Sequence, residues 1–185
     1  MKKDFGKQTF LYPMPVLIIG TYDQDNNPDA MNAAWGGIFN DKQICICLDK
    51  GHKTTDNIKL KKAFTVSIAD EKNIRACDYV GMVSAKKEPD KIKKSGLTPV
   101  KSRFVDAPVF EELKMVLECE LVSYDEKTEQ CVGNIINVAA DESVLTDGKI
   151  DPAKLKPVTY DSVNHKYRAI GEVVADAFSV GKEIK

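Results

Sequence analysis

The loop at residues 50–55 (KGHKTT) gathers side chains that suit an anionic ligand. It lies between an apolar run and a stretch expected to form a helix, and a helix N-terminus offers unpaired N–H groups and a partial positive charge to a phosphate. Its members that carry a positive charge, an imidazole or a hydroxyl are Lys50, His52, Lys53, Thr54 and Thr55. Gly51 lets the backbone approach a ligand closely. A capped helix with solvated lysines is an equally good interpretation of this loop when it is taken alone.

A second candidate is the stretch of small residues at 32–35 (NAAW). Ala33 and Ala34 would let a flat ring lie close to the backbone, Asn32 offers one adaptable polar group, and Trp35 offers an aromatic wall. The alternative is tight sheet packing, with the tryptophan in the core or in a dimer interface. The four residues alone favour that alternative.

The two candidates gain meaning from their spacing. A single expected strand, residues 44–48, separates them in what we interpret as a meander of strands joined by short turns. A shelf for a ring and a loop for a phosphate would then lie at neighbouring strand ends, which is the separation that a mononucleotide needs.

The elements that must position these residues are mainly strands. Apolar or alternating runs predict strands at residues 16–22, 44–48, 63–69, 115–121 and 130–140. Helices are expected at residues 53–62, with Thr54 or Thr55 as the N-cap, and at 73–80, stopped by Gly81. The last two strands form a hairpin with a turn at residues 125–129. The sum is one domain, residues 1–185, of the mainly β or α+β class: an antiparallel barrel with a few short helices.

Composition excludes several classes of protein. The net charge is −1, and no apolar run approaches the ~20 residues that span a bilayer, so we expect a cytoplasmic protein that does not bind a membrane. Five cysteines without a Cys-x-x-Cys pair fit small buried hydrophobes, Cys45 and Cys47 included. Two histidines are too few to suggest a metal site. Neither a Rossmann glycine motif nor a Walker loop occurs.

The remaining polar features predict no catalytic residue. The basic stretch at residues 86–103 lacks interleaved aromatic side chains, so a solvated loop, or one that bounds an anionic cofactor, is favoured over a nucleic-acid site. His165 is expected to be an exposed loop histidine. No pair of carboxylates is spaced in a way that nominates a hydrolase.

Seven segments of the chain also match, in order, a pattern that covers nearly its whole length. They are residues 13–21 (PMPVLIIGT), 32–35 (NAAW), 50–55 (KGHKTT), 64–67 (FTVS), 78–84 (DYVGMVS), 90–91 (DK) and 167–171 (YRAIG). In these segments the chain resembles the flavin reductase-like FMN-binding split barrels, and within them the flavoredoxin type.

The resemblance implies an antiparallel FMN-binding split barrel that forms a homodimer, with one FMN near each subunit boundary. It assigns the ring and ribityl contacts to Asn32, Ala33, Ala34 and Trp35, and the phosphate to Lys50, His52, Lys53, Thr54 and Thr55. Lys91 would reach toward the flavin, and Tyr167 would cover the ring. Many relatives have a histidine where this chain has Gln130, which weakens any mechanism that needs an imidazole there.

Three functions follow as hypotheses. The first is an oxidoreductase that takes hydride or electrons from NAD(P)H or a redox-protein donor onto bound FMN; hydride transfer needs close stacking rather than a protein acid or base. The second is a non-enzymatic FMN electron carrier. The third is a barrel that binds a phosphorylated ligand and has no redox role.

Overall fold

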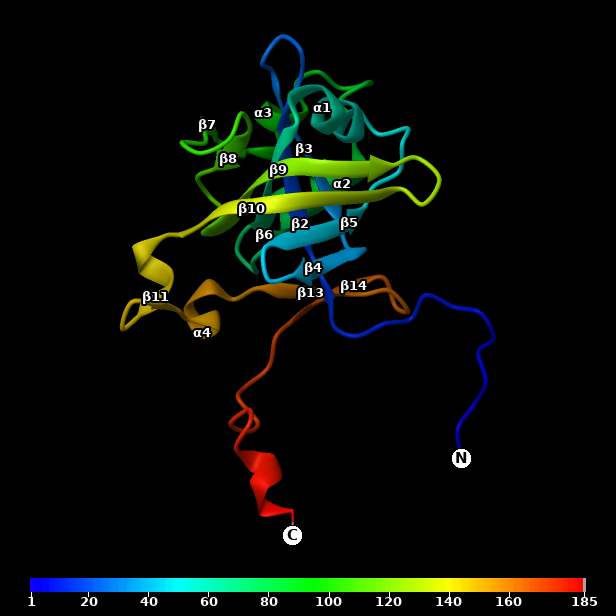
Figure 1. Cartoon of the computed structure of the whole chain (residues 1–185), viewed down its shortest axis with the longest axis vertical. Helices are drawn as coiled ribbons and strands as arrows, with labels where there is room; N and C mark the ends of the chain where they lie inside the picture. Colours follow the sequence, from blue (N-terminus) through cyan, green and yellow to red (C-terminus); the bar gives the residue numbers. More distant parts are fainter. Residues whose placement is uncertain (185) are drawn as a thin grey trace.

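A curled antiparallel sheet of seven strands forms the body of the molecule (Figure 1). The structure is a computed structural model, and it describes residues 1–184. The sheet has the order β3-β2-β6-β9-β10-β5-β4. Its strands are β2 (Leu17–Tyr22), β3 (Pro28–Ala33), β4 (Gly36–Asn40), β5 (Gln43–Cys47), β6 (Ala63–Ile68), β9 (Met115–Asp125) and β10 (Gln130–Ala140).

Short elements surround this sheet. The remaining strands are β1 (Met14–Pro15), β7 (Pro99–Lys101), β8 (Pro108–Phe110), β11 (Leu145–Thr146), β12 (Lys149–Ile150), β13 (Val158–Asp161) and β14 (Lys166–Ala169). The helices are α1 (Lys53–Lys61), α2 (Ile74–Met82), α3 (Lys91–Ser95) and α4 (Pro152–Leu155), with 3₁₀ turns at Glu142–Val144 and Val180–Glu183. No helix within residues 1–184 is both long and apolar enough to cross a membrane.

The connection between β3 and β4 shows why the sheet curls. These strands are the two opposite edges of the sheet, yet only Ala34 and Trp35 lie between them. Three Cα–Cα steps span at most about 11 Å, so the end of β3 must lie near the start of β4 and the sheet must curl to bring these edges toward each other. The Cys47 N–H donates to the Trp35 carbonyl at 2.8 Å, which extends the β4–β5 pairing by one residue beyond Gly36 and Ile46. The antiparallel split barrel with short helices is thereby confirmed.

The predicted meander is correct only in part. β2 pairs with β3 and β4 pairs with β5, as expected. The meander is wrong at the link from β3 to β4, because that link crosses the seam instead of forming a hairpin. The stretch at 32–35 and the loop at 50–55 nonetheless lie at neighbouring strand ends, as predicted, because the β4–β5 hairpin pairs Gly36 with Ile46 and so places the start of β4 beside the end of β5.

Strand β2 is buried on both of its faces. Leu17 and Ile19 pack inside the barrel with Phe64, whereas Ile18 packs outward in a second cluster that includes Cys77 and Val80 of α2. A strand covered on both sides reads as a continuous apolar run, which is why the segment at 16–22 shows no alternation. The hairpin of β9 and β10 is also present, with ten paired positions and two bulges.

Two helix ends differ from the predicted ones. The N-cap of α1 is His52 and not a threonine, because Thr54 and Thr55 are buried in the first turn and bond to other parts of the chain. Helix α2 continues through Gly81 to Met82. A Cβ on Gly81 would lie 2.8 Å from the Asn32 Cβ, so this glycine allows α2 to approach β3 closely instead of ending the helix.

The cysteines divide into two groups. Cys77, Cys119 and Cys131 are buried as predicted, and burial raises the pKa of each thiol to about 12. The prediction was wrong for Cys45, which is half-buried, and Cys47, which is exposed. Ile44 and Ile46, at the alternate positions of β5, take the core face.

Gly133 offers a direct test of packing in the barrel. A Cβ at this position of β10 would lie 2.5 Å from the Phe64 ring, which is fully buried. We expect Gly133→Ala to lower the free energy of unfolding by about 1–3 kcal/mol in urea denaturation, because the core must shift. Gly37→Ala on β4 is the matched control: its added methyl would meet nothing within 4 Å, and an equal loss there would contradict this account.

Candidate functional site

A cavity of about 540 Å³ opens at the seam of the barrel, and we call it the seam cavity. Four of the predicted residues, Asn32, Ala33, Ala34 and Trp35, line one side of it. Trp35 is 47% exposed and is therefore a wall of this cavity rather than a core residue. The other lining residues are Met31, Cys47, Asp49, His52, Asp78, Gly81, Met82, Tyr160, His165 and Tyr167.

A smaller cavity of about 240 Å³ continues from the first, and we call it the loop cavity. The two share the lining residues Met31, Asn32, His52, Gly81 and Met82. The loop cavity adds Lys53, Thr54, Ser84 and Lys91, which are cationic or carry a hydroxyl, together with the carboxylate of Asp29, which pairs with Lys91. The seam cavity is thus lined by small and aromatic residues, and the loop cavity by lysines and hydroxyl groups.

Two predicted residues lie outside both cavities. Lys50 is exposed and is absent from either lining. Thr55 is fully buried, and its hydroxyl donates to the Asp49 carbonyl at 2.8 Å, which also accepts the His52 N–H. Thr55 therefore stabilises the conformation of the loop at 50–55 without facing either cavity.

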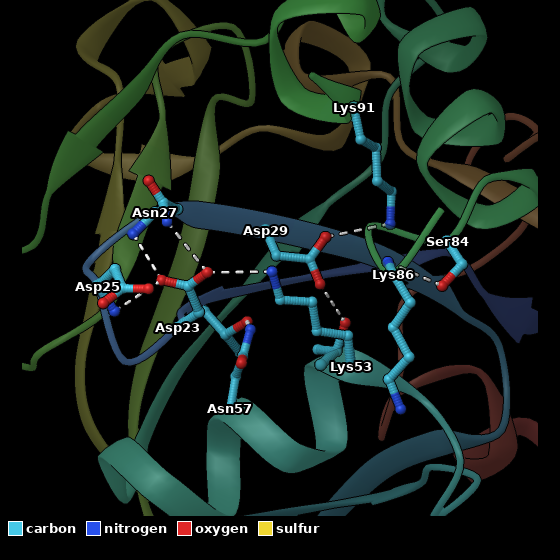
Figure 2. A network of polar contacts seen from close by, with 11 residues as sticks. Asp23, Asp25, Asn27, Asp29, Lys53, Asn57, Ser84, Lys86 and Lys91 are labelled. Carbon is cyan, nitrogen blue, oxygen red and sulfur yellow. Dashed lines mark hydrogen bonds and ion pairs between the residues drawn. The ribbon is translucent and has the colours of Figure 1, made fainter. Parts of the chain in front are cut away.

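Buried carboxylates hold the cationic end in place (Figure 2). Asp29, which is 1% exposed, accepts the Thr54 hydroxyl at 2.9 Å and the Lys91 Nζ at 3.2 Å. Lys91 itself is only 3% exposed, so the basic stretch is not a purely solvated loop: it forms the short helix α3 and sends one lysine inward. Asp23 accepts the Lys53 Nζ at 3.0 Å.

At the seam end, hydrogen bonds orient the aromatic wall. The Tyr167 hydroxyl donates to Asp78 at 2.7 Å, and the Asn32 amide donates to the Cys77 carbonyl at 3.1 Å. Burial and the bond to Asp78 raise the pKa of Tyr167 well above its usual range, so this tyrosine stays a proton donor. Tyr167, on β14, is thereby tied to α2 across the cavity.

Sequence reasoning missed several lining residues. His165 is exposed in the β13–β14 turn, as expected, but its ring also lines the seam cavity and lies 2.9 Å from the Tyr160 hydroxyl. The position of Gln130 lacks a histidine, yet His52 and His165 both bring an imidazole to this cavity. Asp23 and Asp29 carried only a turn signal, because a lone carboxylate gives no sign of the lysine that it will meet.

The Asp23–Lys53 pair should make stability depend on pH. Burial alone would raise the pKa of Asp23, but hydrogen bonds from Lys53, Asn27 and the Asp25 N–H outweigh it and lower the pKa to about 2. A lowered folded-state pKa gives stability that is complete above about pH 4 and is lost as the pH falls toward about 2. We expect Asp23→Asn to reduce this acid-dependent loss in urea titrations between these pH values. Equal pH slopes for both proteins would contradict the pair's contribution.

Comparison with known proteins agrees with this geometry. Residues 9–170 match the flavin reductase like domain. The fold is similar to that of flavoredoxin from Desulfovibrio vulgaris (Miyazaki F), with 42% identity, coverage of 98% of this chain and 100% of that one, and a TM-score of 0.94. Flavoredoxin from Methanosarcina acetivorans is 24% identical with full coverage of both chains and a TM-score of 0.91.

A third solved structure extends the comparison of the fold. It is the FMN-binding domain of a flavin reductases-like enzyme from Shewanella baltica, which is 21% identical over 88% of each chain with a TM-score of 0.78. The match to the family domain covers most of the chain, and the match to the Desulfovibrio protein covers almost all of it. This chain therefore belongs to the flavin reductase-like domain family and is of its flavoredoxin type.

Proposed function

We propose that this chain binds FMN and uses it to take up and pass on electrons. The carrying observation is the joined pair of cavities, flat-walled at the seam and cationic at the loop. The isoalloxazine ring would lie in the seam cavity against Ala33, Ala34 and Trp35. The phosphate would lie in the loop cavity beside Lys53, Thr54 and the N-terminus of α1.

The residues present fit this cofactor. Asn32 and the backbone of the small-residue stretch supply polar groups at the rim of a ring, while Met31, Met82 and Tyr167 supply apolar surface. A phosphate dianion needs cations and N–H donors, and the loop cavity has both. Bound FMN would supply the electron-accepting chemistry, and the chain would bind it, orient it and limit access of water.

The electron donor distinguishes two forms of this function. A flavin-dependent oxidoreductase would accept a hydride from NAD(P)H, and a carrier would accept electrons only from another redox protein. The electron carrier is the second candidate function, and the 42% identity to a flavoredoxin supports it.

One titration tests both forms. The purified protein should be yellow and should take up FMN stoichiometrically. Rapid anaerobic bleaching by NADH or NADPH would support the enzyme, and bleaching only by a reduced redox protein would support the carrier. Protein that never takes up FMN would exclude both and leave the barrel for another phosphorylated ligand.

We further propose that the chain works as a homodimer. Apolar side chains from the N-terminal arm and β4 line a groove on the far side of Trp35, among them Phe10, Leu11 and Ile38. The C-terminal segment beyond β14 extends away from the body and leaves these side chains uncovered by it (Figure 1). Phe10, Leu11 and Ile38 are 43–70% exposed. Such a contiguous exposed patch is typical of an interface.

The test of the dimer is sedimentation equilibrium. The wild type should sediment at twice the chain mass, and Ile38→Asp should sediment as a monomer because it places a charge in the apolar interface. Leu60→Asp is the control, because Leu60 is an exposed residue of α1 outside this groove. A monomeric wild type would overturn this part of the proposal.

A further inference from the structure

The loop cavity borders a third cavity of about 700 Å³, which we call the outer cavity. Only Lys53 and Ala85 line both. The outer cavity is otherwise bounded by residues at the start of β3 and in and around α3, including Pro28, Ile92 and Leu97. Besides Lys53 and Asp23, its charged lining residues are Asp90 and Lys93, which are of opposite sign. Any group that extends from a phosphate in the loop cavity would have to pass Lys53 to enter this space.

Asp23 stands on the outer side of that boundary. It lines the outer cavity and not the loop cavity, and it holds the Lys53 Nζ at 3.0 Å (Figure 2). Its carboxylate also accepts the Asn27 N–H at 2.8 Å, the Asp25 N–H at 3.0 Å and the Asn27 side-chain amide at 3.2 Å. The side chain is 12% exposed, so these bonds fix it in one position.

The charge on this carboxylate is permanent at neutral pH. The bonds that fix it keep its pKa near 2, far below physiological pH. A fixed negative charge thus faces the outer cavity immediately beyond the lysine that faces the loop cavity. A group that leaves the loop cavity for the outer cavity would therefore meet Lys53 first and Asp23 second.

We propose that Asp23 makes this site selective for a phosphate monoester, so that the chain binds FMN and rejects FAD. This inference rests on the proposed FMN site. A monoester ends in the loop cavity, where its oxygens meet Lys53, Thr54 and the α1 N-terminus. The second phosphate of FAD would have to extend past Lys53 toward Asp23, and like charges that are brought together without water repel each other strongly.

The outer cavity makes this selectivity depend on charge and not on lack of space. At about 700 Å³ it is larger than the loop cavity of about 240 Å³, so an adenylate would not be excluded by volume. Removing the charge of Asp23 while keeping its shape should therefore open the site to FAD. Asp23→Asn does this, since an asparagine can still accept the Asn27 N–H.

The experiment measures dissociation constants for FMN and FAD by quenching of flavin fluorescence in the apoprotein. We expect the wild type to bind FMN about tenfold or more tightly than FAD, and Asp23→Asn to reduce this ratio about fivefold or more. Asp141→Asn is the matched control. Asp141 is likewise ionised with a pKa of about 2 and paired with a lysine, Lys114, but it lines neither the loop nor the outer cavity.

The outcomes separate this inference from the proposed function. Equal affinity of the wild type for FMN and FAD would overturn the inference and leave the FMN site intact, whereas no binding of either flavin would overturn the site itself. An unchanged ratio in Asp23→Asn would show that Asp23 does not select. If that variant does not fold, as judged by circular dichroism, the wild-type ratio and the same measurement on Asp23→Ser decide.

Discussion

Replacing Lys53 and Thr54 together by alanine should weaken FMN binding by about 2–4 kcal/mol, because charge-assisted hydrogen bonds contribute about 1.5–3 kcal/mol each and are not fully additive. Both side chains line the loop cavity at the start of α1. Both are also held there by carboxylates, since Lys53 meets Asp23 and Thr54 meets Asp29. Their positions are thus set before a ligand binds, so these side chains lose less conformational entropy on binding.

The measurement is the FMN dissociation constant of the double variant, by calorimetry or by fluorescence quenching. Lys59→Ala is the matched control, because this lysine lies in the last turn of the same helix and pairs with Glu126 at the surface. The single variant Lys50→Ala is informative as well: its side chain lies outside both cavities, so its affinity should remain close to that of the wild type. An unchanged dissociation constant in the double variant would reject the loop cavity as the phosphate site.

Lys91→Met should lower the free energy of unfolding of the apoprotein by about 3–5 kcal/mol, because it leaves a buried carboxylate without its cation. Lys91 and Asp29 are 3% and 1% exposed, and the Lys91 Nζ lies 3.2 Å from the Asp29 carboxylate. An unpaired charge at that depth cannot be stabilised by water, and the Thr54 hydroxyl is the other partner that the structure shows for it.

Urea denaturation with a compensating variant separates charge from packing. Lys91→Met combined with Asp29→Asn should recover most of the lost stability, because a neutral amide replaces the unpaired charge and can still accept the Thr54 hydroxyl. Lys94→Met on the same helix is the control, since Lys94 pairs with Glu88 at the exposed surface and should matter little. If the single and combined variants lost equal stability, the ion pair would not be the cause.

The carboxylates that organise the cationic end show where local sequence information stops. Asp23 and Asp29 belong to a turn-rich stretch, and nothing in their neighbourhood indicates Lys53 or Lys91, which lie 30 and 62 residues away along the chain. A pairing at such separations depends on which elements pack together. Only the tertiary structure determines that.

The sequence by itself determined the strands with strong apolar patterns, the β9–β10 hairpin and the chemical character of the two stretches at 32–35 and 50–55. These depend on residue type, period and turn chemistry, which act over a few residues. The tertiary structure decided that β3 and β4 are opposite edges of one curled sheet, so that Ala34 and Trp35 bridge its seam. The β4–β5 hairpin brings Trp35 to Cys47 and so joins the small-residue stretch to the anion loop. The separate sheet of β1, β13 and β14 carries Tyr167 and His165 to the same cavity, and only the packing of that sheet against the barrel puts them there. A curled sheet buries its inner face, and that gain belongs to the whole chain rather than to any one segment.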